Sequence, residues 1–243
     1  MKRRRRLTGD FAGRRTAVAG AGIMVGTGIL VATYPCWRPW CLSWGATAKE
    51  VGDQLPGDEL LVDTDVITTR AVSIGAPPEA VWPWLAQMGS GRGGLYTYDW
   101  IENLLGLHMH SVDFVLPEFQ AIKVGDAQTL GQKGPTLRVA ISDKNHALVL
   151  RSDDGNWVWG FVLQPAGAGS RLLSRNRIAI PGASKPMRWF YRYVMEPGSL
   201  IMERKMLLGI KERAERLVTD DPRRFTKERC ESDRVPESGT LYP

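Results

Sequence analysis

The sequence is poor in the residues that build disulfide scaffolds and metal sites. It holds only three cysteines and three histidines among 243 residues. Three cysteines exclude a disulfide scaffold, although Cys36 and Cys41 could form one small-loop disulfide or remain free thiols. Cys230 lies in a polar terminal segment and no Ser-His-Asp order is evident, so nothing supports a hydrolytic nucleophile.

A second absence is the glycine-rich loop that holds nucleotide phosphates. The segment GSGRGG at Gly89–Gly94 lacks the GxxxxGK[ST] pattern, and it follows an expected helix rather than a strand. A dinucleotide fingerprint needs its glycines between a strand and a helix. We therefore interpret this segment as a flexible connection and expect no cofactor.

Beyond its first fifteen residues the chain carries no excess charge. The net charge of +6 arises entirely in that segment, which holds seven of the 32 basic residues but only one of the 26 acidic residues. Binding to nucleic-acid phosphates needs clustered lysine and arginine side chains. The balanced remainder therefore argues against a nucleic-acid partner, and the basic start indicates membrane topology instead.

Charged residues are also missing from positions 16–34, which form an apolar run of nineteen residues. At 1.5 Å per residue a helix of this length spans about 28 Å, close to the ~30 Å hydrocarbon core of a bilayer. The run ends at Tyr34 and is followed by Trp37, Trp40 and Trp44, aromatic residues that prefer the membrane interface. We predict a transmembrane helix over 16–34.

The basic tail at residues 1–15 orients this predicted helix. The positive-inside rule places the tail in the cytoplasm and the rest of a single-pass protein of the cell membrane outside it. A cleaved signal peptide shares these features and stays open as an alternative. Gly22 and Gly26 form a GxxxG spacing that would permit a weak homodimer through the membrane helix.

The remaining sequence predicts one α+β domain between two irregular segments. Residues 35–63 lack periodicity and are interpreted as a juxtamembrane linker, and the polar residues 219–243 as a disordered tail. Between them, the periodicity predicts strands over 66–74, 137–141, 147–151, 157–163 and 172–180, short helices over 81–88 and 99–105, and a long amphipathic helix over 200–218. Consecutive strands at this spacing indicate an antiparallel meander.

The segment VITTRAVSIGAPPEAVWPWLAQMG, with WVWGFVLQP, GSRLLSRNRI and the final helix, resembles the START-like superfamily, which includes polyketide cyclases and the birch-pollen allergen. The resemblance covers roughly residues 64–218. The RPWxxxWGA and GRGGxYxYDWxEN segments are similar to a membrane-anchored actinobacterial-type subgroup. The resemblance implies a helix-grip fold, in which a curved antiparallel sheet wraps around the C-terminal helix and leaves a hydrophobic cavity.

Two strands carry candidate ligand-binding residues. Trp157, Trp159 and Phe161 share one face because side chains alternate along a strand, and they could line a cavity or fill a core. Arg175 and Arg177 share a face of the next strand. They could be solvated on the convex side, or Arg175 could point inward and hold a ligand carboxylate with its guanidinium.

The stretch between residues 96 and 113 is the densest in polar and aromatic side chains. We expect it to close the mouth of the cavity, with Tyr96, Tyr98, Trp100, His108 and His110 as ligand-binding residues. A metal site would need both histidines together with Glu102 or Asp113, and too few ligands are close in the sequence to predict one.

These features together predict a membrane-anchored START-like domain that binds or presents a hydrophobic small molecule or lipid in an internal cavity, and they favour binding over catalysis. Two alternatives remain. One is a cyclase- or hydratase-type enzyme that uses His108 or His110 as an acid–base group. The other is a non-catalytic assembly module that dimerises through its membrane helix.

Overall fold

The computed structural model describes residues 32–104, 106, 109–131 and 134–221. The chain divides into two compact units, Met1–Cys41 and Leu42–Pro243. No helix within the described ranges is long and apolar enough to cross a membrane. The predicted membrane helix, apart from its last three residues, and its Gly22–Gly26 pair lie outside the described residues.

The described part of the first unit is helical. Within it, the Tyr34 hydroxyl donates a hydrogen bond to Cys41 Sγ over 3.8 Å, and its ring packs edge-on against Trp37 with centroids 4.5 Å apart. No disulfide joins Cys36 to Cys41. Of the two alternatives for this cysteine pair, the structure therefore shows the reduced one.

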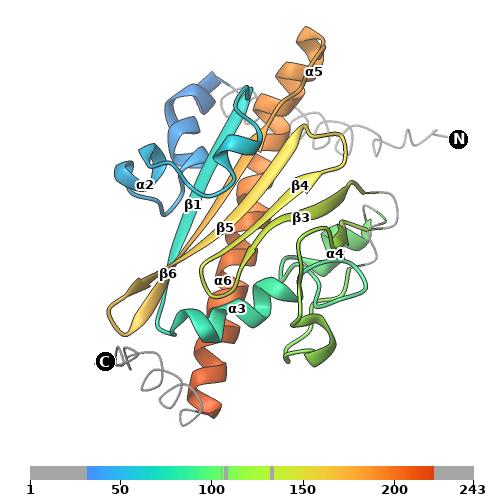
Figure 1. The fold of residues 1–243 in the computed structure, drawn as a ribbon. Coiled ribbons are helices and arrows are strands. Elements are labelled where there is room, and N and C mark those ends of the chain that lie inside the picture. Colours follow the sequence, from blue (N-terminus) through green and yellow to red (C-terminus); the bar gives the residue numbers. More distant parts are fainter. Residues whose placement is uncertain (1–31, 105, 107–108, 132–133, 222–243) are drawn as a thin grey trace, which may run out of the picture. The chain divides into compact units, whose positions relative to one another are not determined.

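The second unit is built on one six-stranded sheet (Figure 1). The strands are β1 (Val66–Ile74), β2 (Ala127–Thr129), β3 (Thr136–Asp143), β4 (Ala147–Ser152), β5 (Trp157–Ala166) and β6 (Gly169–Ile178). Their order is β1-β6-β5-β4-β3-β2, and every neighbouring pair is antiparallel. The predicted antiparallel sheet is confirmed, and β1 pairs with β6 although about ninety residues separate them in the chain.

The tight hairpin between β5 and β6 shows how the sequence sets the strand register. Ala166 pairs with Gly169, which leaves a loop of two residues. Gly167 opens that loop with φ of 61°, a conformation that side chains with a Cβ rarely adopt. The hairpin register then places Trp159 opposite Asn176.

The helices are α2 (Ala48–Gly52), α3 (Pro78–Ala86), α4 (Asp99–Leu104), α5 (Lys185–Phe190) and α6 (Glu196–Asp220). Short turns are η1 (Asp58–Leu60), η2 (Pro117–Phe119) and the π-helical η3 (Tyr191–Met195). The long helix α6 packs on β1 and α3, and it crosses one face of the sheet, here called the inner face (Figure 1). This arrangement confirms the predicted α+β class with a long C-terminal helix.

The main apolar core fills the space between the inner face, α3 and α6. Alternation along β1 sends Val72 and Ile74 into this core, and α6 contributes Met206 and Ile210 from one helical stripe. All of these side chains are buried, so burying apolar area here supplies most of the stability of the domain.

The outer face of the sheet is covered by the segment 44–62. Its Leu55 joins Ala71, Val162 and Leu173 in a second, smaller core. Glu50 of α2 accepts two hydrogen bonds from the Arg171 guanidinium, at 2.7 and 2.9 Å. These bonds hold the pKa of Glu50 at about 2, well below its usual value. The stretch that the sequence suggested to be a connection thus forms an outer layer of the sheet.

Candidate functional site

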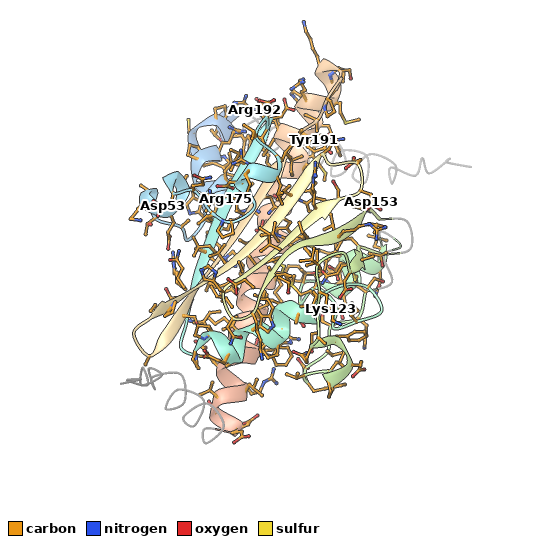
Figure 2. All side chains as sticks on the ribbon, in the orientation of Figure 1. Asp53, Lys123, Asp153, Arg175, Tyr191 and Arg192 are labelled. Carbon is orange, nitrogen blue, oxygen red and sulfur yellow. The ribbon has the colours of Figure 1, made fainter. Side chains whose placement is uncertain are left out.

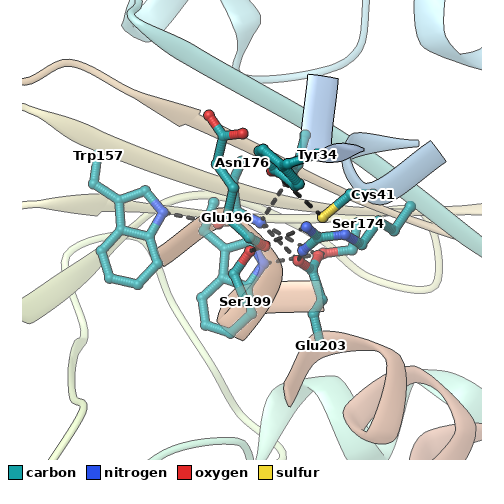
Figure 3. Close-up of polar contacts among 11 residues, drawn as sticks. Tyr34, Cys41, Trp157, Ser174, Asn176, Glu196, Ser199 and Glu203 are labelled. Atoms are coloured by element: carbon teal, nitrogen blue, oxygen red, sulfur yellow. Dashed lines mark hydrogen bonds and ion pairs between the residues drawn. The ribbon is translucent and has the colours of Figure 1, made fainter. Parts of the chain in front are cut away.

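A polar cluster lies inside the grip, between the inner face and α6. Its members share a position on the inner side of a strand or on the sheet-facing side of α6. They are Thr68 and Arg70 of β1, Trp157 and Trp159 of β5, Ser174 and Asn176 of β6, and Ser199 and Glu203 of α6. We call this set the interior polar cluster (Figure 3).

The centre of the cluster is an ion pair between Arg70 and Glu203. An Arg70 Nη1–H donates to Glu203 Oε2, and Nη2 donates to Ser199 Oγ over 3.0 Å. The Arg70 side chain is fully buried and that of Glu203 is 6% exposed. Either charge would be strongly unfavourable there alone, and the contact between them offsets part of the cost of burying both.

Neutral groups complete the hydrogen bonding of the Glu203 carboxylate. The Ser174 hydroxyl donates to Oε1 over 2.5 Å, and Asn176 Nδ2 lies 3.3 Å from both carboxylate oxygens. The indole N–H groups of Trp159 and Trp157 then donate to Ser174 Oγ at 3.0 Å and Asn176 Oδ1 at 2.8 Å. A continuous hydrogen-bonded chain therefore runs from the tryptophans to the buried ion pair.

The tryptophans form an aromatic wall beside this chain. Trp157 and Trp159 are stacked with centroids 5.6 Å apart, and Trp159 contacts Phe161 at 4.9 Å. The prediction that these three residues share the inner face is confirmed. Trp159 and Phe161 are buried in the main core, whereas Trp157 is only half-buried. Trp157 is thus the end of the wall that solvent reaches.

Two surface hollows lie away from this wall. One of about 380 Å³ is lined by residues of β3 and of the turn after β4. Another of about 420 Å³ lies between the outer segment and the sheet, and Arg175 and Arg177 line it. Between the two alternatives for the inner face, the packing of Trp159 and Phe161 favours a filled core in this conformation.

Arg175 and Arg177 both project from the outer face, as the first alternative expected, but they are not solvated there, because their side chains are only 6% and 13% exposed. Arg175 is buried there and binds the outer segment through Asp58 Oδ2 at 2.6 Å and the Asp53 carbonyl oxygen at 2.8 Å (Figure 2). Arg177 donates to the Leu61 carbonyl oxygen at 2.7 Å. Arg175 therefore does not reach the inner face, where a ligand carboxylate was considered.

The loop between residues 94 and 113 separates its predicted site residues. Tyr96 is buried, donates its hydroxyl hydrogen to the Trp84 carbonyl oxygen at 3.0 Å, and has its pKa raised by burial. Tyr98 is half-buried and lies under Lys205 of α6, whose Nζ is 5.9 Å from the ring centroid. Trp100, in contrast, is 68% exposed.

Of the two candidate histidines, the structure describes His110 alone, and it does not join the interior polar cluster. His108 lies outside the described residues. The His110 side chain is 91% exposed and its Nδ1 is 3.7 Å from Asp99 Oδ2. Because His110 projects into solvent and the cluster is buried, the two cannot form one site.

The carboxylates considered as metal ligands have other partners. Asp113 pairs with Arg213 at 2.7 Å. Glu102 is buried and accepts a hydrogen bond from the Thr97 hydroxyl at 2.5 Å, and burial raises its pKa. Across the part of the chain that the structure describes, no group of three or more histidine, cysteine or acidic side chains could hold a metal ion.

Sequence reasoning missed the residues at the centre of the cluster. The signal was present in β1, where Arg70 has the same parity as the core residues Val72 and Ile74. A charge on the apolar face of a strand needs a buried partner. Glu203 is the corresponding charged residue on the buried side of α6, where it precedes Met206 and Ile210.

Comparisons with known proteins give structural likenesses alone. No known family matches the sequence, and no curated protein is similar to it. The solution structure of the KanY protein is 17% identical and covers 63% of this chain and 99% of its own, with a TM-score of 0.42. A polyketide-cyclase-like protein from Corynebacterium glutamicum is also 17% identical, covers 65% and 94%, and has a TM-score of 0.34. The Aha1 dimer from Colwellia psychrerythraea is 13% identical, covers 62% and 96%, and has a TM-score of 0.32.

Proposed function

We propose that the domain binds a small, largely apolar molecule on the inner face of the sheet, with one polar group at the interior polar cluster. The observation that carries this proposal is the buried Arg70–Glu203 pair with its polar partners, which lies beside the main apolar core. Replacing a buried ion pair with well-packed apolar residues is often neutral or stabilising, so stability alone does not account for it. A role as the polar anchor for a ligand would account for the buried pair.

The entry to this site is at Trp157. Its ring is half-buried, and its N–H bond to Asn176 is the outermost link of the hydrogen-bonded chain. A ligand oxygen can take the place of Asn176 Oδ1 as the acceptor for the Trp157 N–H, and a ligand hydroxyl can also donate to the Oδ1 that this exchange frees. The apolar part of the ligand would then lie against the Trp157–Trp159 stack, and Phe161 would remain in the core beneath it.

A matched pair of tryptophan variants tests this proposal. We expect the full chain to take up a fluorescently labelled dodecanoic acid in a saturable manner. Trp157→Phe keeps an aromatic ring but removes the N–H donor, so uptake should weaken by about three- to ten-fold. Trp100→Phe is the control, since Trp100 is exposed on α4 and should leave uptake unchanged. Fluorescence titration measures both.

Two results would count against this proposal. If the unmodified chain showed no saturable uptake, the inner face would serve only to form the packed core and would not bind a ligand. If uptake were lost in Trp100→Phe alone, the binding site would lie instead at the loop that contains Tyr96, Tyr98 and His110. Circular dichroism shows whether each variant remains folded.

We also propose that the protein is attached to the cell membrane by residues 16–34, with the domain outside the cytoplasm. The support is the uncharged run of nineteen residues after a basic tail. Fractionation should then recover the full chain with membranes in the presence of carbonate at high pH, and added protease should digest the domain in intact spheroplasts. Recovery in the soluble fraction, or a domain protected in spheroplasts, would contradict this arrangement.

A further inference from the structure

The helix before α6 carries an unusual set of side chains. Residues 185–195, with the sequence KPMRWFYRYVM, comprise α5 and the π-helical η3, and we call them the aromatic spur. The spur contains four aromatic residues and three basic residues but no acidic residue. It therefore combines apolar area with positive charge of one sign.

The apolar side chains of the spur are exposed around the helix. Met187, Trp189, Phe190, Val194 and Met195 are each between 44% and 52% exposed. They are spread over more than two turns at spacings of two, one, four and one residues, so no single face of the spur carries them all. The following helix α6 differs, because one side of it is buried in the core.

The structure holds the spur in place rather than leaving it as a loose end. The Ser184 side chain caps its first turn by accepting a hydrogen bond from the Met187 amide at 3.4 Å. Arg188 forms an ion pair with Asp65 at 2.5 Å. Trp189 packs on Tyr193 with centroids 5.0 Å apart. The exposed aromatic side chains are thus presented by an ordered helix.

The two other cations remain at the surface of the spur. Lys185 is exposed in the first turn, and Arg192 is exposed in η3 with its guanidinium 5.8 Å from the Tyr193 ring centroid (Figure 2). Cations beside tryptophan and tyrosine rings suit the headgroup region of an anionic membrane, where the rings keep their polar atoms hydrated.

We infer that the aromatic spur docks onto the surface of an anionic lipid bilayer. A protein partner covers one face of a helix, whereas lipid can surround an inserted tip, and the spur exposes apolar side chains on more than one face. Complementarity of charge favours the same partner, since an anionic headgroup meets basic side chains and no acidic one. This inference concerns residues 185–195 and does not depend on the ligand site or on the predicted membrane helix.

Photocrosslinking of the full chain distinguishes the possible occupants. Phe190→p-benzoylphenylalanine places a photoreactive aromatic group in the spur, and Val124→p-benzoylphenylalanine is the control at an exposed position before β2. Each protein is mixed with or reconstituted into vesicles of equal parts phosphatidylglycerol and phosphatidylcholine and irradiated. Intact mass spectrometry then measures the fraction that carries a lipid adduct. We expect the adduct at position 190 to exceed that at 124 by about five-fold or more.

Charge reversal tests the electrostatic part of the inference. Lys185→Glu with Arg192→Glu should lower the adduct at position 190 by about five-fold for each reversed charge. Pure phosphatidylcholine vesicles should have a similar effect. Equal adducts at 190 and 124 would overturn the inference, as would crosslinks from 190 to a second copy or to the N-terminal segment of the same chain. Because the readout is a lipid adduct, failure of dodecanoic acid uptake would leave it unchanged.

Discussion

Replacing Glu203 with leucine is expected to destabilise the domain by about 3–5 kcal/mol. The substitution removes the Glu203 carboxylate from the fully buried Arg70 guanidinium. It also removes the acceptor for the Ser174 hydroxyl and the Asn176 amide. For a domain of this size the midpoint of thermal unfolding should fall by about 10 °C or more, which calorimetry or circular dichroism can measure.

The double variant separates the ion pair from simple packing. Arg70→Met alone should be destabilising in the same way, because it leaves Glu203 as an unpaired charge. Arg70→Met with Glu203→Leu removes both charges and should recover most of the lost stability. If the double variant were as unstable as the sum of the two single variants, the ion pair would contribute nothing of its own.

Periodicity explains how much of the fold the sequence predicts. Strand β1 was expected over 66–74 and begins and ends at those residues. The aromatic residues of β5 were also placed on the correct face, since alternation depends only on local geometry. No bounds were predicted for strand β2, because three residues are too few to show a period.

The start of the long helix shows where local signals mislead. The sequence predicted a helix from residue 200, and Pro197 with Gly198 obscured an earlier start. In the structure α6 begins at Glu196, and Pro197 occupies its first turn, where a missing N–H is tolerated. The π-helical η3 then joins α5 to α6 without a break, so the aromatic spur extends the helix in the N-terminal direction.

The interior polar cluster could not be predicted as a site because its members are distant in the sequence. Arg70 and Glu203 are 133 residues apart, and their meeting depends on α6 packing across β1. For Arg175, by contrast, local alternation along the strand was enough to decide which face the side chain occupies. Its side chain was considered for the inner face, but its parity places it with Leu173 of the second core, on the outer face.

Replacing Arg175 with leucine should release the outer segment while leaving the inner face intact. Arg175 Nη2 donates to the carbonyl oxygens of Glu50 and Val51, and Nη1 donates to Asp58. These acceptors are partly buried and would lose a charged donor, so we expect a loss of about 3 kcal/mol. Hydrogen exchange of residues 48–60 should become faster, because the segment would lose the hydrogen bonds that Arg175 makes to Glu50, Val51 and Asp58.

Arg138→Leu provides the matched control for this prediction. Arg138 of β3 pairs with Asp153, which follows β4. Both side chains are about half exposed, so loss of this ion pair should lower the free energy of unfolding by less than about 1 kcal/mol. Uptake of the labelled dodecanoic acid should be the same for Arg175→Leu and Arg138→Leu, since neither side chain reaches the inner face. A variant of Arg175 that keeps slow exchange over 48–60 yet loses uptake would show instead that its guanidinium binds the ligand carboxylate. The two measurements therefore decide between a role for Arg175 in holding the outer layer and a role in binding.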